Sequence, residues 1–237
     1  MKSLKSLFHK QEFNPGFISL FINPFYFARK GLYQHISELA RNNIIGRILD
    51  VGCGSKPYLS LFPYHEYIGM ELEGGNSGAD CYYTGNKFPF KDEEFDSVIT
   101  SQVLEHVPAP DVFLSEIHRI LKGGGILLLT VPFIWDEHEQ PHDYARYSSF
   151  GLVSLLEKNG FIVIQHRKSM TGIRAVFQML NVYTYKKTAT ENHYLNVIKT
   201  FFLIAPFNIL GEIAGYLFPG NNDLYLDNII LARRKKT

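Results

Sequence analysis

The sequence has 237 residues, of which 46% are hydrophobic, enough for one large α/β domain with a full core. The chain has 24 Lys and Arg and 23 Asp and Glu, which gives a net charge of +1. It therefore lacks the large positive charge typical of nucleic-acid-binding proteins, and no nucleic-acid partner is expected. Two cysteines, Cys53 and Cys81, provide neither a disulfide framework nor a metal-ligand spacing, so a cytoplasmic location without a metal site is predicted. The first residues, MKSLKSLFHKQEFNPGF, make a poor signal peptide.

An amphipathic helix is predicted near the start of the chain. Asn23 is its expected N-cap and Pro24 its first residue. Its apolar face is expected to comprise Phe25, Ala28, Leu32, Ile36 and Leu39. We therefore predict an N-terminal helical lead-in over residues 1–45, followed by one domain over residues 46–237.

Strand and helix patterns then alternate. The segments RILDV, YIGMEL, DCYYT, FDSVIT and GILLLTV are typical of strands, several of them continuously apolar as buried parallel strands are. Pro110 is expected to open a helix that ends at Gly123–Gly125, and Ser148 to cap a helix that stops at Gly160, before the strand FIVIQH. This alternation predicts a doubly wound, Rossmann-like α/β sheet.

A glycine turn follows the first predicted strand, in ILDVGCGSKPY. Gly52 and Gly54 allow a sharp backbone turn and the close approach of a ligand at the carboxyl end of a strand, where ligands of such sheets bind. A dinucleotide site would need a third glycine at position 57, and the residue there is Pro57.

An acidic residue closes the second predicted strand. Glu71 stands 21 positions after Asp50, where a carboxylate can accept hydrogen bonds from ribose hydroxyls. The alternative is a solvated loop carboxylate, as Glu73 illustrates. The pattern favours a nucleoside site without a phosphate cradle.

Four segments carry a family resemblance: ILDVGCGS, YIGMELE, FPFKDEEFDSVITSQVLEHV and EIHRILKGGGILLLTVP. Together they resemble the class I S-adenosylmethionine-dependent methyltransferases, particularly the type 11 group, over about residues 46 to 165. The resemblance implies a seven-stranded sheet with a final antiparallel hairpin, and LYLDNIILARRK fits the last strand. It also implies S-adenosyl-L-methionine as the cofactor.

The resemblance also assigns cofactor-binding residues. It implies that Glu71 binds the ribose and that Gly85 and Asn86 lie against the adenine, although Thr84 stands where type 11 members often have an acid. The residues implied to line the methionine part are Asp50, Gly52, Cys53 and Gly54, and Leu72, Ser101 and Gln102 complete the predicted set. Cys53 is interpreted as a small turn residue rather than a nucleophile.

Catalytic candidates lie in two predicted loops. An oxygen or nitrogen acceptor must usually lose a proton, so the base candidates are His138, His142 and Asp143 in FIWDEHEQPHDYARYSSF. His106 in SQVLEHV, which follows the fourth strand, is a further candidate. The alternatives are that Asp143, with Arg146 and Tyr147, only holds its loop, and that His106 packs at a helix entrance.

A long segment, residues 170–222, precedes the last predicted strand. It contains VIKTFFLIAPFNILGEIAGYLF, which Lys199, Pro206, Asn208 and Glu212 are expected to interrupt, so no transmembrane helix is predicted. We expect a helical insertion that forms a lid over an apolar acceptor. The alternatives are contact with a membrane surface, together with SLKSLF and the terminal RRKK, core padding, or a homodimer interface.

The sequence therefore predicts an S-adenosylmethionine-dependent methyltransferase. Its acceptor is expected to be a small molecule, a saccharide or a lipid-like compound, methylated on oxygen or nitrogen by direct displacement with base assistance. The protein is expected to be cytoplasmic or peripheral to a membrane. A non-catalytic cofactor-binding protein stays an alternative, as does a nicotinamide-dependent oxidoreductase, against which Pro57 argues.

Overall fold

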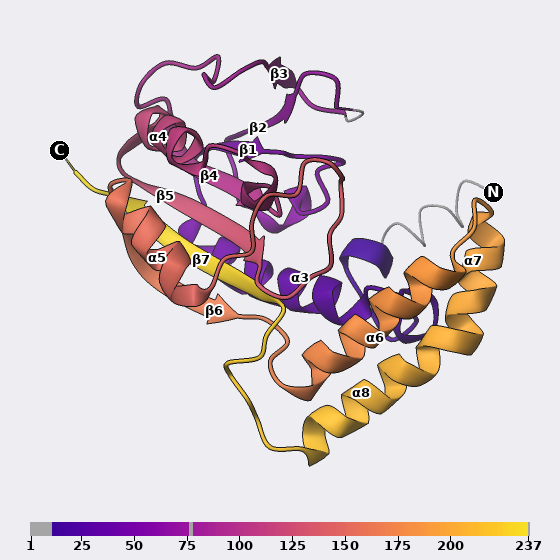
Figure 1. Cartoon of the computed structure of the whole chain (residues 1–237). Helices are drawn as coiled ribbons and strands as arrows, with labels where there is room; N and C mark the ends of the chain where they lie inside the picture. Colours follow the sequence, from indigo (N-terminus) through magenta and orange to yellow (C-terminus); the bar gives the residue numbers. More distant parts are fainter. Residues whose placement is uncertain (1–10, 76–77, 237) are drawn as a thin grey trace. The chain divides into compact units, whose positions relative to one another are not determined.

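The computed structural model describes residues 11–75 and 78–236, and these form two compact units. One unit, called the helical unit, combines the described residues up to Gln34 with Ile134–Asp136 and Lys168–Asp227. The other, called the sheet unit, consists of His35–Phe133, Glu137–Arg167 and the described residues from Asn228 onward. Figure 1 shows the strands and helices of both units.

Seven strands form one sheet in the order β3-β2-β1-β4-β5-β7-β6 (Figure 1). Their bounds are Arg47–Val51 (β1), Glu66–Leu72 (β2), Cys81–Tyr83 (β3), Phe95–Ser101 (β4), Leu121–Pro132 (β5), Phe161–Lys168 (β6) and Asp227–Arg234 (β7). The neighbouring pairs among β1 to β5 are parallel. Their carboxyl ends therefore share one edge of the sheet, which confirms the predicted Rossmann-like arrangement.

The last two strands are antiparallel. The N–H of Lys235 donates to the carbonyl of Gly160 at 3.0 Å, whereas at the other end the N–H of Ser169 donates to the carbonyl of Asp227 at 2.9 Å. Residue numbers thus rise along one strand as they fall along the other. The expected final antiparallel hairpin is present.

Two helices of the sheet unit follow the predicted pattern, with one difference. In α5 (Ser149–Lys158), the hydroxyl of Ser148 accepts from the N–H of Gly151 at 3.2 Å. Helix α4 (Pro110–Ile120) ends earlier than predicted, because Leu121 already pairs with Phe95 at the start of β5. The glycine run 123–125 lies inside that strand, next to a shift in register. Two short 3₁₀ helices are η1 (Leu59–Leu61) and η2 (Leu104–His106).

The N-terminal helix α3 (Tyr26–Asn43) begins two residues later than predicted. The N–H of Phe25 donates to the side-chain oxygen of Asn23 at 2.8 Å, so Asn23 closes a turn before the helix instead of capping it. The expected apolar face is otherwise correct. Its buried members are Ala28, Leu32, Ile36 and Leu39.

The other elements of the helical unit are helices. Their bounds are Ser19–Ile22 (α2), Ile173–Thr188 (α6), His193–Lys199 (α7), Thr200–Ile204 (η3, a π-helical turn) and Ala205–Leu217 (α8). The last three join into one helix of 25 residues, His193–Leu217. Figure 1 shows α6 and α8 side by side.

The expectation that polar residues interrupt this helix is wrong. Pro206 lies in the first turn of α8, where its missing N–H costs little. Asn208 is buried and donates to the carbonyls of Leu20 and Asn23 at 2.9 and 3.1 Å. Glu212 pairs with basic residues of the same unit. By length and composition the helix could cross a membrane, since an 18-residue window has a mean hydropathy of 1.6 and is only 28% buried.

Candidate functional site

The glycine turn lies at the carboxyl end of β1. Gly52 and Gly54 have φ angles of +72° and +48°, which glycine adopts readily. A Cβ on Gly52 would overlap the side chain of Val103, whereas a Cβ on Gly54 would meet no atom within 4 Å. Gly52 is therefore required by the packing of the protein itself. Gly54 leaves open space beside the backbone, which a ligand can fill.

The carboxylate of Glu71 lies over this turn. Its Oε2 accepts a hydrogen bond from the N–H of Gly54 at 3.2 Å, and its Oε1 accepts from the N–H of Leu72 at 3.1 Å. The acid that closes β2 is thus held beside the turn that follows β1. The side chain of Leu72 is half exposed next to it. This geometry disfavours the alternative of a freely solvated loop carboxylate.

Asp50 lies beneath the turn and is buried. Burial raises the pKa of its carboxyl from 3.8 to about 6, and the nearby charge of Glu71 adds to the rise. The hydroxyl of Tyr67 donates a hydrogen bond to Asp50 and partly offsets it. In turn, burial and the charge of Asp50 raise the pKa of the Tyr67 hydroxyl.

Cys53 is 2% exposed within the turn. Burial, with the carboxylates of Asp50 and Glu71 nearby, raises the pKa of its thiol to about 12. The thiol is therefore protonated near neutral pH and is a poor nucleophile. This agrees with its interpretation as a turn residue.

The sequence analysis did not predict a role for two residues near the turn, Lys56 and Asp80. The carboxylate of Asp80 accepts from the N–H of Gly69 and from the ammonium of Lys56, both at 2.7 Å, and these bonds lower its pKa. The signal in the sequence was an acid at the start of the third predicted strand, DCYYT. Nearby, Gly85 and Asn86 lie in the exposed turn after β3, and a Cβ on Gly85 would meet no atom within 4 Å.

The loop after β4 contacts the glycine turn through Val103, as the Gly52 overlap shows. Ser101 at the end of β4 shares a hydrogen bond of 2.8 Å with the hydroxyl of Thr130. Gln102 has a φ of +58°, an uncommon backbone conformation for a residue other than glycine, and its N–H donates to the carbonyl of Thr130 at 2.9 Å. Such outliers cluster at functional sites. The predicted cofactor-binding residues Ser101 and Gln102 are thus held at the expected edge of the sheet.

Three side chains with acid–base or metal-binding character converge beside this loop. They are Glu105, which is fully buried, and His106 and His138, which are partly exposed. The two imidazole rings lie edge to face with centroids 4.7 Å apart, and one ligand atom from each of the three residues falls within 4.8 Å of the others. We call these residues the Glu–His–His cluster. Sequence reasoning named both histidines as base candidates but gave Glu105 no role.

The loop after β5 is held by an ion pair. Asp143 receives two hydrogen bonds of 2.6 Å from the guanidinium of Arg146 and one of 3.0 Å from the N–H of His138. The bonds from Arg146 lower the pKa of Asp143 to about 2. A carboxylate so stabilised is a weak base, which favours the structural alternative for Asp143.

His142 occupies a different position from the cluster. Its ring is exposed and its Nδ1 lies 3.1 Å from the hydroxyl of Tyr144, whereas its backbone carbonyl accepts from the Nδ1 of His106 at 2.7 Å. The structure thus brings His106 and His138 together. The catalytic roles assigned to these histidines stay predictions.

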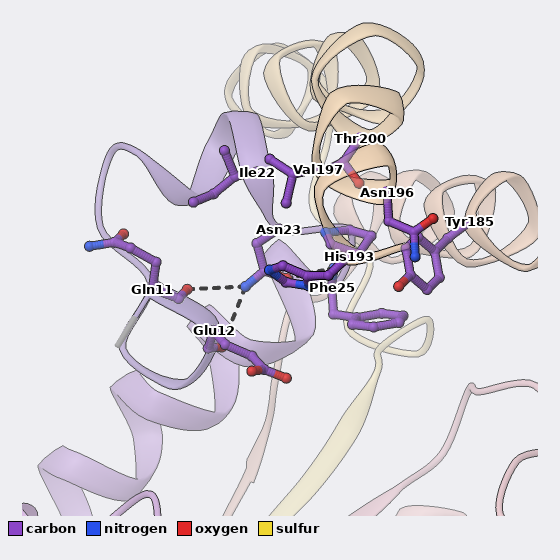
Figure 2. Close-up of a pocket in the computed structure, with 11 residues that line it drawn as sticks. Gln11, Glu12, Ile22, Asn23, Phe25, Tyr185, His193, Asn196, Val197 and Thr200 are labelled. Atoms are coloured by element: carbon purple, nitrogen blue, oxygen red, sulfur yellow. Dashed lines mark hydrogen bonds between the residues drawn. The ribbon is translucent and has the colours of Figure 1, made fainter. Parts of the chain in front are cut away.

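The helical unit contains a pocket of its own. Figure 2 shows its lining, which includes Asn23 and Phe25 from the N-terminal segment and His193, Asn196 and Thr200 from the long helix. Its volume of about 210 Å³ is below the range of about 300–1,000 Å³ that is usual for ligand pockets. None of the predicted site residues lines it.

Comparison with known proteins finds matches to part of the sheet unit. Residues 49–129 match the protein family described as "Methyltransferase domain". An uncharacterized methyltransferase of Mycobacterium leprae is 34% identical over 105 residues, which cover 38% of this chain and 39% of that protein. The fatty-acid O-methyltransferase of Mycolicibacterium smegmatis is 30% identical over 118 residues, covering 43% of each chain. The chain thus spans about two fifths of the length of these relatives.

Among solved structures, the cyclase SpnF superposes with a TM-score of 0.58 at 19% identity, covering 90% of this chain and 83% of that one. This likeness concerns the fold. It agrees with the seven-stranded fold predicted from the sequence. The matching residues 49–129 include all of the predicted cofactor-binding residues.

Proposed function

We propose that this chain is a class I S-adenosylmethionine-dependent methyltransferase, and that it methylates an oxygen or nitrogen of a lipid-like acceptor at a membrane surface. The cofactor supplies a methyl carbon that its sulfonium charge has already activated. The protein must hold the cofactor, orient the acceptor and provide for removal of the acceptor's proton.

The residues of the glycine turn fit this cofactor. The open space beside Gly54 admits a ligand against the backbone, and the carboxylate of Glu71 lies where two ribose hydroxyls could donate to it. Because Pro57 stands where a dinucleotide site would need its third glycine, the turn suits a nucleoside without phosphates. These features support S-adenosylmethionine over a nicotinamide dinucleotide.

The proposal of a lipid-like acceptor is based mainly on an exposed apolar face of the helical unit. Along the helix His193–Leu217, large apolar side chains that are 38–81% exposed recur every three or four residues. We call them the apolar face: Tyr194, Leu195, Ile198, Phe201, Phe202, Leu203, Ile209, Leu210, Ile213, Tyr216 and Leu217. Val176, Leu180 and Tyr183 of the neighbouring α6 are exposed as well. Exposed apolar surface of this kind marks contact with a membrane or with another protein.

Charges around the face favour a membrane. Between Thr200 and Phe218 the one charged residue is Glu212, and its carboxylate is turned inward to Lys30 at 2.5 Å and Arg174 at 3.2 Å. The exposed Lys187, near the end of α6, can meet anionic headgroups while the helix lies in the interface. A lipid-like acceptor would be concentrated at such a surface. The fatty-acid O-methyltransferase among the relatives supports this acceptor class.

Vesicle flotation tests the membrane part of the proposal. The protein should float with phosphatidylcholine vesicles that contain phosphatidylglycerol. The double change Phe202→Ser and Ile213→Ser should reduce the floating fraction by about tenfold. Each serine would remove most of the free energy gained when an apolar side chain moves from water into the membrane. Phe150→Ser is the matched control, because Phe150 is 87% exposed in the sheet unit. Equal flotation of all variants would show that the apolar face does not bind the membrane. A dimer seen in light scattering, without flotation, would assign it to a second copy of the chain.

A further inference from the structure

We propose that the Glu–His–His cluster binds a divalent transition-metal ion, with Glu105, His106 and His138 as its ligands. The cluster lies beside the loop that contacts the glycine turn, so an ion there would be near the cofactor end of the sheet. The binding itself follows from the geometry of these side chains. The role that we assign to the ion rests on the proposed methyl transfer.

The orientation of His106 provides the first argument. Its Nδ1 lies 2.7 Å from the carbonyl oxygen of His142, and because a carbonyl can only accept, Nδ1 must carry a proton. In the neutral ring, Nε2 then has a lone pair, and this atom lies 3.8 Å from the Oε1 of Glu105. Two electron-rich atoms face each other across a gap too long for a hydrogen bond. A cation bound between them would be attracted to both atoms.

The surroundings of His138 provide the second argument. Its Nδ1 lies 3.4 Å from the carboxylate of Asp143, which Arg146 keeps ionised, and also 3.4 Å from the Nη2 of Arg146. A histidine that binds a metal commonly directs its second nitrogen at a carboxylate or a carbonyl, because this fixes the ring and its tautomer. Here one ring nitrogen of His138 faces a carboxylate and one of His106 faces a carbonyl. His106 therefore has the supporting contact expected of a metal ligand, and His138 has an ionised carboxylate beside its ring.

The donor set indicates which ions fit. Two imidazole nitrogens and one carboxylate suit Zn²⁺ and similar transition metals, whereas Mg²⁺ and Ca²⁺ prefer oxygen ligands. The three ligand atoms lie within 4.8 Å of one another, and around a Zn²⁺ ion they would be about 3.4 Å apart. Small movements of the two partly exposed histidine side chains would close the site. Three protein ligands leave a coordination position for an acceptor oxygen.

In the proposed reaction, the ion would bind the hydroxyl oxygen of the acceptor and lower its pKa, so that its proton passes to water or buffer. An oxygen electron pair then forms the bond to the methyl carbon, while the electron pair of the breaking carbon–sulfur bond stays on sulfur. The cluster would thus replace a single general base.

Calorimetric titration with Zn²⁺ of the full chain, after treatment with a chelator, tests the site. We expect one ion per chain, and His106→Ala, His138→Ala and Glu105→Gln should each weaken binding more than about 100-fold. His142→Ala is the control, since it keeps the backbone carbonyl that orients His106, and its affinity should be unchanged. Circular dichroism establishes that each variant is folded. If Glu105→Gln does not fold, the two histidine variants decide the result.

Failure to bind Zn²⁺ would overturn the proposal, as would binding that neither histidine variant weakens. Because the titration needs neither acceptor nor cofactor, its outcome is independent of the proposed function. If the chain binds one zinc ion but its removal leaves methyl transfer unchanged, the metal site is confirmed and its catalytic role is rejected.

Discussion

The backbone N–H of Gly54 donates a hydrogen bond of 3.2 Å to the carboxylate of Glu71, and so joins the turn after β1 to an acid in the last part of β2. The two residues are 17 positions apart in the sequence but adjacent at the carboxyl edge of the sheet. A nucleoside that binds there meets a backbone without a Cβ on one side and an acceptor for its ribose hydroxyls on the other.

Replacing Glu71 with Ala should therefore weaken cofactor binding. Loss of charge-assisted hydrogen bonds to the ribose should cost about 1.5–3 kcal/mol, or about 10- to 150-fold in Kd, measured with S-adenosylhomocysteine by calorimetry. Glu73→Ala is the matched control, because Glu73 is an exposed acid two positions along. Equal affinities of the two variants would remove Glu71 from the ribose site.

Gly54→Ala should reduce cofactor affinity more than it reduces stability. The new Cβ would enter the open space that the cofactor is expected to occupy, at a positive φ that itself costs about 1 kcal/mol. Gly74→Ala offers the same kind of strain, with a φ of +90° and open space around the Cβ, outside the predicted cofactor set. We expect similar melting temperatures for the two variants and a loss of binding only at Gly54. A parallel loss of binding in both would show that strain, rather than occupied space, is responsible.

The raised pKa of Asp50 predicts a pH-dependent stability difference. Between its ordinary pKa of 3.8 and its folded pKa of about 6, the folded state binds this proton more tightly than the unfolded state, so raising the pH through that window destabilises the folded protein. A difference of about two pH units corresponds to about 3 kcal/mol. Asn cannot ionise, so Asp50→Asn should gain stability relative to the wild type by up to about 3 kcal/mol between about pH 4 and pH 7.

Urea unfolding of both proteins without cofactor measures this difference. Asp92→Asn is the control, because it removes an exposed carboxylate from the same unit. A stability difference between wild type and Asp50→Asn that does not vary with pH would show that folding does not raise the pKa of Asp50.

His142→Ala separates the side chain of this residue from its backbone. Because its ring is exposed and its carbonyl holds His106, we expect methyl transfer to fall less than about tenfold. If the ring of His142 were the base, transfer should instead fall by about 10²–10⁴-fold and recover in part as the pH rises from about 6 to 9. Initial rates at saturating cofactor distinguish the two cases.

The sheet could be predicted from the sequence because its strands are short apolar runs, and the order of motifs identified the edge where they end. The helix over His193–Leu217 could not be predicted from the sequence as one continuous helix. The hydrogen-bond partners of Asn208 and Glu212 come from α2, α3 and α6, which are far away in the sequence. The same holds for Glu105 and His138, which are separated by 33 positions and meet only when the loops after β4 and β5 fold together. Local patterns indicate elements, whereas contacts between distant loops require the structure.

The most direct test of the account is the fate of the methyl group. The purified protein is incubated with S-adenosylmethionine labelled in that group and with separate lipid, saccharide and protein fractions of a cell extract. We expect label in the organic phase of the lipid fraction, strongly reduced in Glu71→Ala and retained in Glu73→Ala. Label confined to the saccharide or protein fraction would contradict the lipid-like acceptor, and cofactor binding without transfer to any fraction would contradict methyl transfer itself.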